Sequence, residues 1–173
     1  MQINEIRIRT AAGNRRRGWL MAGSLIIPVA LGKGGILANK REGDNGTPRG
    51  SFTPLRLWWR ADRHSRPRTP LPVRAIGSQD GWCEDPTDRH YNQPIRLQQG
   101  HAGDRLRRDD HLYDFIIEID HNTRPRIAGR GSAVFLHLAR PHFGPTAGCV
   151  AMTRPAMLQL LRRIGPHTRI NIA

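Results

Sequence analysis

The chain has 173 residues, with 28 Lys and Arg against 14 Asp and Glu, which gives a formal net charge of +14. Such a charge predicts affinity for polyanions, but no zinc spacing, RNP aromatics or helix-turn-helix accompanies it, so nucleic acid is not an expected partner. The apolar content of 38%, with 18 Gly and 13 Pro, favours one domain of many short strands over long helices.

Residues 15–32 mimic a signal peptide, because a basic run precedes an apolar stretch and small residues. This stretch is too short to span a bilayer, so no transmembrane segment is expected. We interpret residues 19–31 instead as a pair of core strands broken near Gly23-Ser24. No convincing targeting signal then remains.

Hydrophobic periodicity predicts a mostly β chain with one helix. Alternating or continuous apolar residues predict strands, and the apolar spacing after Pro155, ended by Gly165-Pro166, predicts the helix. The expected strands are 2–10, 19–31, 51–60, 73–77, 115–119, 133–137 and 169–172; the expected loops are 42–50 and 63–72; a helical turn is expected at 104–111 and the helix at 154–164.

The segment 80–97 is mostly polar, with the aromatic residues Trp82 and Tyr91 among the polar ones. It is longer than a simple loop between two strands. It fits a functional loop beside a site. It equally fits a structural Ω-loop held in place by Trp82.

A cysteine and a histidine lie close in sequence near the carboxyl end. Cys149 follows a glycine, and His137, twelve residues earlier, ends the apolar run from Ala133. An imidazole is the base best suited to activate a thiol near neutral pH. Gly148 permits a tight turn whose N–H groups, with that of Cys149, would form an oxyanion hole. A buried cysteine also serves as an ordinary small core residue, so the pair alone leaves both interpretations open.

Two blocks of sequence resemble a known family. His137 followed by Thr146-Ala-Gly-Cys-Val150 resembles the signature of the L,D-transpeptidase (YkuD-type) catalytic domain, in a proteobacterial branch. Residues 32–36 and 40–53, with Thr-Pro-x-Gly-x-Phe at 47–52, are similar to the early segment of that family. The resemblance implies a mainly β fold, a YkuD-like sandwich or barrel with one helix after the cysteine, as a single catalytic domain over 1–173.

The resemblance also implies a reaction. Cys149 would attack a peptidoglycan stem peptide, His137 would accept the thiol proton, the carbonyl near Leu138 would orient the ring, and D-alanine would leave before a 3→3 cross-link forms. It implies no cofactor, a periplasmic or cell-envelope location, and covalent inhibition by β-lactams such as carbapenems. The expected substrate-binding residues are Arg140, His142, Thr146, Trp82 and Tyr91.

Departures from the family pattern keep alternatives open. Many members carry histidine where this chain has Ala147, and arginine or asparagine where it has Ala151. Arg140 or His142 would then supply the missing polar groups. The same dyad would also support an L,D-carboxypeptidase or amide hydrolase, and a degenerate fold would leave a non-catalytic basic protein that binds cell wall or nucleic acid.

Two further arrangements of the same residues are less favoured. His137, His142 and Cys149 match no common zinc spacing, so no metal site is expected. A Cys83–Cys149 disulfide would remove the nucleophile, so we expect both thiols to be free.

Overall fold

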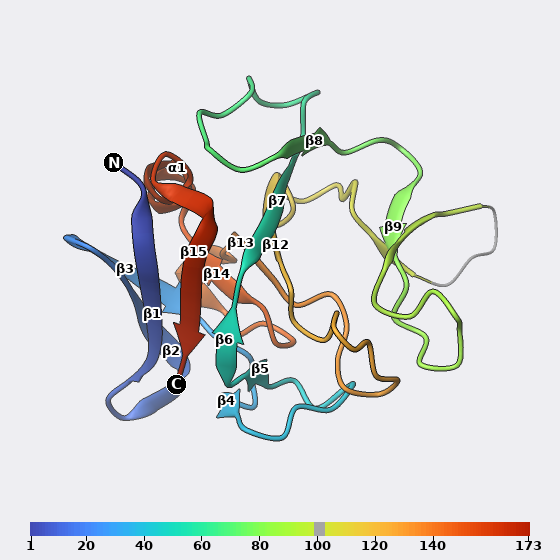
Figure 1. Ribbon diagram of the computed structural model, residues 1–173, viewed down its shortest axis with the longest axis horizontal. Helices are drawn as coiled ribbons and strands as arrows, with labels where there is room; N and C mark the ends of the chain where they lie inside the picture. Colours follow the sequence, from blue (N-terminus) through green and yellow to red (C-terminus); the bar gives the residue numbers. More distant parts are fainter. Residues whose placement is uncertain (99–102) are drawn as a thin grey trace.

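The computed structural model describes residues 1–98 and 103–173 (Figure 1). Strands make up most of the regular structure in these residues, and one short α-helix follows Cys149, which confirms the mainly β class. The elements are β1 (Ile3–Ala11), β2 (Asn14–Ala22), β3 (Leu25–Ala30), β4 (Ile36–Leu37), β5 (Thr47–Pro48), β6 (Gly50–Phe52), β7 (Pro54–Trp59), β8 (Val73–Ala75), β9 (Asp80–Trp82), β10 (Pro94–Arg96), β11 (Asp104–Arg105), β12 (Phe115–Ile119), β13 (Phe135–Leu138), the 3-10 helix η1 (Pro141–Phe143), β14 (Val150–Met152), α1 (Arg154–Leu161) and β15 (Ile164–Ile172).

One ten-stranded sheet organises the fold, in the order β6-β15-β1-β2-β3-β14-β13-β12-β7-β8. The first and last strands, β1 and β15, pair in parallel and lie side by side in Figure 1. β6 lies at one edge and β7 next to the other edge, yet only Thr53 separates them in the chain. The sheet must therefore curl back on itself, which gives the barrel-like shape expected of the fold.

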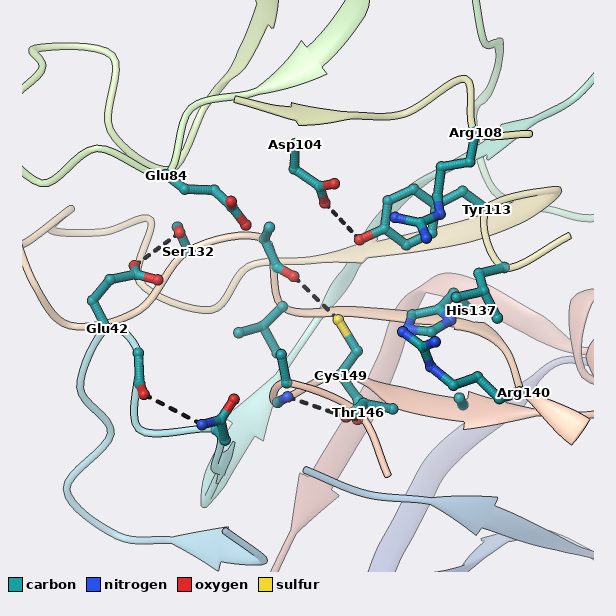
Figure 2. A pocket seen from close by; sticks show the side chains of 18 of the residues that line it. Glu42, Glu84, Asp104, Arg108, Tyr113, Ser132, His137, Arg140, Thr146 and Cys149 are labelled. Carbon is teal, nitrogen blue, oxygen red and sulfur yellow. Dashed lines mark hydrogen bonds between the residues drawn. The ribbon is translucent and has the colours of Figure 1, made fainter. Parts of the chain in front are cut away.

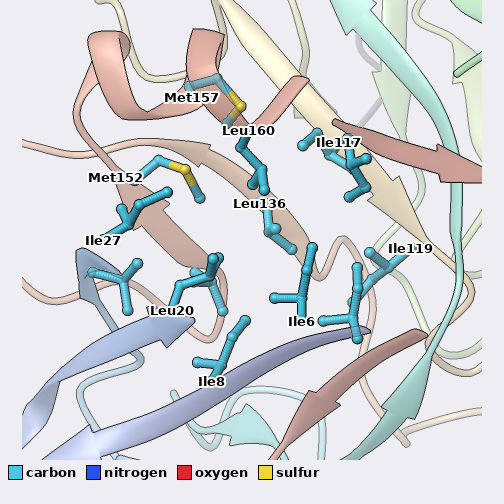
Figure 3. Close-up of a cluster of buried hydrophobic side chains, with 14 of the residues drawn as sticks. Ile6, Ile8, Leu20, Ile27, Ile117, Ile119, Leu136, Met152, Met157 and Leu160 are labelled. Atoms are coloured by element: carbon cyan, nitrogen blue, oxygen red, sulfur yellow. The ribbon is translucent and has the colours of Figure 1, made fainter. Parts of the chain in front are cut away.

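The inner face of the curled sheet holds the main core. Alternate residues of β1 to β3 point inward, as in Ile6, Ile8 and Leu20, which are fully buried (Figure 3). The helix closes this core with Met157 and Leu160. Full burial of each large aliphatic side chain contributes about 1.5–3 kcal/mol, so this core fixes the strands that carry the residues discussed below.

Most expected elements form, with some shifted boundaries. The pair of strands broken at Gly23-Ser24 is present, and the segment 51–60 is divided at Thr53. The helix ends at Leu161, because Ile164 already belongs to the last strand. The helical turn at 104–111 is wrong: Asp104 and Arg105 instead pair with Trp82 and Gly81 of β9.

The segment 80–97 contains two strands, β9 and β10, which form a small sheet with β11. Trp82 lies in a second apolar cluster with Trp58, Tyr113 and Phe135, and Cys149 belongs to the same cluster. None of the helices that the structure describes has the length and apolar character needed to cross a bilayer.

Candidate active site

Two parallel strands place His137 and Cys149 at one site. β13 carries His137, which pairs with Ala151 of β14, and Cys149 immediately precedes β14. The histidine and the cysteine therefore come from neighbouring strands at the centre of the ten-stranded sheet. The structure thus brings the two residues that the sequence singled out to the same cavity.

Both side chains line a cavity of about 360 Å³ (Figure 2). Its walls come from the loop after β4, the segment 104–113 and the two ends of β13. The lining side chains that carry polar chemistry are Lys40, Glu42, Asn45, Glu84, Asp104, Arg108, Tyr113, Ser132, His137, Arg140, Thr146 and Cys149.

The Cys149 thiol is buried and is held by backbone groups. Its Sγ donates to the Ala133 carbonyl at 3.2 Å and accepts from the Phe135 N–H at 3.3 Å. Burial raises the pKa of the thiol to about 12, although the hydrogen bond from Phe135 acts in the opposite direction. Cys149 is therefore a protonated thiol at neutral pH.

The His137 imidazole is also buried, and its orientation is fixed. Nδ1 lies 2.8 Å from the Leu138 carbonyl, which can only accept, so Nδ1 carries the hydrogen and Nε2 is left with its lone pair. Burial lowers the pKa of His137 to about 4, and Arg108 and Arg140 act in the same direction. The ring is therefore a neutral base at pH 7.

The two groups share the cavity, but their hydrogen bonds go elsewhere. Within residues 1–98 and 103–173, no hydrogen bond joins Cys149 to His137, since the thiol is bonded to the backbone of the strand that leads to His137. Of the two resting states open to such a pair, these pKa shifts favour a thiol beside a neutral imidazole over a thiolate beside an imidazolium.

The turn before the cysteine is tightly packed. Gly148 has φ +143°, and a Cβ there would lie 2.8 Å from the Gly46 carbonyl oxygen, so only glycine fits. The Thr146 hydroxyl donates to the Cys149 carbonyl at 2.6 Å and accepts from the Gly148 N–H at 3.1 Å. One of the two expected oxyanion donors, the Gly148 N–H, is therefore engaged with Thr146.

The expected substrate-binding residues divide into two groups. Arg140 and Thr146 line the cavity, as expected, whereas His142 is exposed on η1 outside the lining. Trp82 is buried and its Nε1 donates to Asn92 at 3.0 Å. Tyr91 is buried as well, with its hydroxyl donating to Glu42 and accepting from the Gly131 N–H at 2.9 Å. Trp82 and Tyr91 do not line the cavity, although Glu84 of the same segment does, so the segment lies beside the site with these two aromatic side chains buried.

Several residues that the sequence did not single out complete the cavity. Tyr113 packs edge-on against the His137 ring, with centroids 5.3 Å apart, and its hydroxyl donates to Asp104 at 2.6 Å. The Arg108 guanidinium lies over the Tyr113 ring, 5.2 Å from the ring centroid. Neither residue is part of a recognisable motif; each reaches the site through the fold of segment 104–113.

Apart from Lys40, which is paired with Asp44, the acidic and basic groups lie on different parts of the wall (Figure 2). Glu42, Glu84 and Asp104 form the acidic part, and Arg108 and Arg140 the basic part near His137. Desolvation, together with Asp104 and Glu42, raises the pKa of Glu84 to about 7. The cavity therefore offers complementary contacts to a ligand that carries both charges.

The positions of Ala147, Ala151 and Cys83 relate to the departures from the family pattern and to the second thiol. Ala147 and Ala151 both line the cavity, at the places where many family members have larger polar residues. Cys83 is buried and free, and so is Cys149. In the described part of the chain, no three His, Cys, Asp or Glu side chains are grouped to hold a metal ion.

The sequence matches the L,D-transpeptidase catalytic domain, YkuD, over residues 6–172. The chain belongs to this family. A comparison with curated proteins gives no significant match. Among solved structures, the chain is similar to L,D-transpeptidase 3 from Mycobacterium tuberculosis at 12% identity with a TM-score of 0.44, covering 97% of this chain and 60% of that one. The chain thus spans 60% of the length of that protein.

Membership confirms the resemblance seen in the sequence, and the family acts on peptidoglycan. Family members are typically cysteine enzymes, and the chain has its cysteine in the cavity described above.

Proposed function

We propose that the protein is a cysteine-dependent L,D-transpeptidase acting on peptidoglycan stem peptides in the cell envelope. The observation that supports this most is that Cys149 and a buried, neutral His137 line the same cavity, with the Nδ1–H of His137 held by the Leu138 carbonyl. This tautomer leaves Nε2 free to accept a proton, as a general base requires.

In the first half-reaction, the acyl donor is a stem tetrapeptide. The Cys149 Sγ attacks the carbonyl that joins the third residue to the terminal D-alanine, and the thiol proton passes to Nε2 of His137. The carbon–nitrogen bond then breaks, His137 returns the proton to the departing D-alanine amine, and a thioester remains on Cys149.

The second half-reaction resolves the thioester. The amine of a neighbouring stem attacks it, His137 removes a proton from that amine, and the thiol is restored as the 3→3 cross-link forms. Water in place of the amine would give a tripeptide, which is the carboxypeptidase outcome.

Attack requires the thiol to leave its resting contacts. The Sγ hydrogen bond to Ala133 must break so that the proton can reach His137, and the Gly148 N–H must exchange Thr146 for the developing oxyanion if it is to stabilise that charge. Substrate binding would drive both changes.

The basic wall suits the carboxylates of the donor. Arg140 is exposed in the cavity beside His137, and Arg108 lies on the same side. Guanidinium groups bind carboxylates through two parallel hydrogen bonds, so these residues would orient the D-alanine carboxylate. A carbapenem would acylate the same nucleophile, the Cys149 thiol.

The deciding experiment is incubation with a purified disaccharide-tetrapeptide, with products identified by mass spectrometry and Cys149→Ala as the control. Cross-linked dimers with loss of D-alanine support the proposal, and tripeptide alone makes the protein a carboxypeptidase. If no product depends on Cys149, the proposed reaction is wrong.

A further inference from the structure

A second hollow lies away from the cysteine cavity, between the loop that joins β7 to β8 and helix α1. Figure 1 shows this loop next to the helix. The hollow is a groove of about 450 Å³, and it shares no lining residue with the cavity of Cys149. Its polar lining consists of Arg63, His64, Ser65, Arg66, Arg68, Arg154 and Arg162.

Four of these arginines have no partner of opposite charge. Arg66, Arg68, Arg154 and Arg162 are exposed, and among the residues that the structure describes their guanidinium groups form no ion pair or hydrogen bond. Within residues 1–98 and 103–173, no Asp or Glu lines the groove.

Arg63 differs from these four, because it is bound to the buried Asp114 at 2.8 Å, which also accepts from His64 at 2.7 Å. The free positive charge of the groove therefore comes from the other four arginines.

The elements hold these charges close together. Arg154, Leu158 and Arg162 are four residues apart and so lie along one face of the helix. Half-buried Leu158 packs beneath them against the core. On the other wall, Pro67 separates Arg66 from Arg68 and restricts the backbone between them. Convergent cations repel one another, and a multivalent anion would offset that repulsion.

We propose that this groove binds phosphate groups. A phosphate offers several oxygens and up to two charges, and the planar fork of arginine matches it through paired hydrogen bonds. The phosphates could be free or belong to a lipid headgroup, since both present the same chemistry. Such a site would hold the protein to an anionic ligand while the cysteine cavity remains open.

Binding of pyrophosphate, measured by calorimetry at constant ionic strength, tests the proposal. Arg154→Gln with Arg162→Gln should weaken binding by about tenfold or more, given the strength of hydrogen bonds between charged groups. Arg66→Gln with Arg68→Gln, on the opposite wall, should do the same. All four side chains are exposed, so both variants should fold, which thermal melting would check.

The matched control is Arg9→Gln with Arg16→Gln, which removes two exposed charges from the β1–β2 hairpin. It should change the affinity by less than about twofold. An equal loss of affinity in the control would overturn the proposal, because net charge alone would then explain the binding. The absence of pyrophosphate binding by the unaltered protein would overturn it as well.

Vesicles distinguish the two sources of phosphate. Co-sedimentation with phosphatidylglycerol vesicles, but not with phosphatidylcholine, that is lost in the groove variants and kept in the control would assign the site to a lipid headgroup. Pyrophosphate binding without vesicle binding would assign it to free phosphate. Turnover of a soluble stem peptide should be unchanged in both groove variants, so this test is independent of the proposed reaction.

Discussion

The buried thiol of Cys149 makes a direct prediction about its reactivity. Because the pKa of the thiol is raised to about 12, only a very small thiolate fraction exists at pH 7. Alkylation by iodoacetamide should therefore be slow at pH 7 and rise about tenfold per pH unit up to pH 9. The measurement is the rate of mass increase in a Cys83→Ser background, which removes the other buried thiol.

Two comparisons make this test specific. The Cys83→Ser, Cys149→Ser double variant should not react, which assigns the signal to Cys149. Fast, pH-independent alkylation from pH 6 upward would mean that a thiolate is present at rest, in contradiction to the neutral pair described above.

Gly148 has a restricted backbone, and replacing it tests both its positive φ and its close contact with Gly46. Gly148→Ala should destabilise the fold by roughly 2–4 kcal/mol and lower activity, because the alanine meets both an unfavourable φ and the Gly46 carbonyl oxygen. Urea denaturation would measure the free energy of unfolding.

Gly13→Ala is the matched control for Gly148→Ala. Gly13 also has a positive φ, +74°, but nothing lies within 4 Å of an added Cβ. Gly13→Ala should lower the free energy of unfolding by only about 1–2 kcal/mol and leave activity unchanged. Equal losses of stability in the two variants would show that the contact between residue 148 and the Gly46 carbonyl does not contribute to the destabilisation.

At the scale of elements, the loop between β4 and β5 holds the nucleophile turn in place. Asp44 accepts from the Lys40 Nζ at 2.5 Å, the Arg41 N–H at 2.6 Å and the Gly46 N–H at 2.8 Å. Gly46 in turn packs against Gly148. One carboxylate therefore shapes the loop that borders Cys149.

Asp44→Asn should weaken the hydrogen bonds that hold this loop, because it removes the charge of the side chain while keeping its size. Lys40 is buried and would lose its counter-charge, so we expect a loss of about 1–3 kcal/mol in stability together with a fall in kcat. Unfolding curves and kinetics on the stem peptide would measure these effects. Asp88→Asn, at an exposed pair with His90, should cost less than about 1 kcal/mol and leave kcat unchanged. A kcat equal to that of the unaltered protein in Asp44→Asn would contradict this role for the loop.

The elements also show where prediction from sequence succeeds and where it does not. Strands such as β1 and β12 were predictable, because burial on one or both faces leaves an apolar pattern in the sequence. His137 and Cys149 also stood out in the sequence, because they lie twelve residues apart, at the end of an apolar run and after a glycine; His137 lies on β13 and Cys149 immediately before β14. Tyr113 was not predictable, because it reaches His137 only through tertiary packing.

The segment 104–111 shows the physical reason for the failed helical turn. Its charged residues have no periodic apolar face, and pairing with β9 decides the conformation of Asp104 and Arg105. The sequence near Trp82 gives no sign of this pairing. A contact between distant segments therefore places Asp104 in the acidic part of the cavity wall.

On the scale of the whole molecule, two buried histidines link stability to pH. His137 and His121 are at most 9% exposed, and burial lowers the pKa of each to about 4. An unfolded histidine has a pKa near 6.5, so between about pH 6.5 and pH 4 the unfolded chain binds protons that the folded chain does not. The free energy of unfolding should therefore fall as the pH is lowered through this range, by up to about 3 kcal/mol for each histidine.

Urea denaturation at pH 7, 5.5 and 4 would measure this loss, and His121→Leu isolates one contribution. The Nδ1 of His121 is buried without a hydrogen-bond partner among the described residues, so an apolar side chain gives up no bond at that atom. The variant should lose less stability between pH 7 and pH 4 than the unaltered protein, because one proton fewer is taken up on unfolding. His167→Gln, at an exposed position, should follow the unaltered protein. A His121→Leu profile parallel to that of the unaltered protein would show that His121 takes up its proton without unfolding. Of the two buried histidines, only His137 would then contribute to the loss of stability in acid.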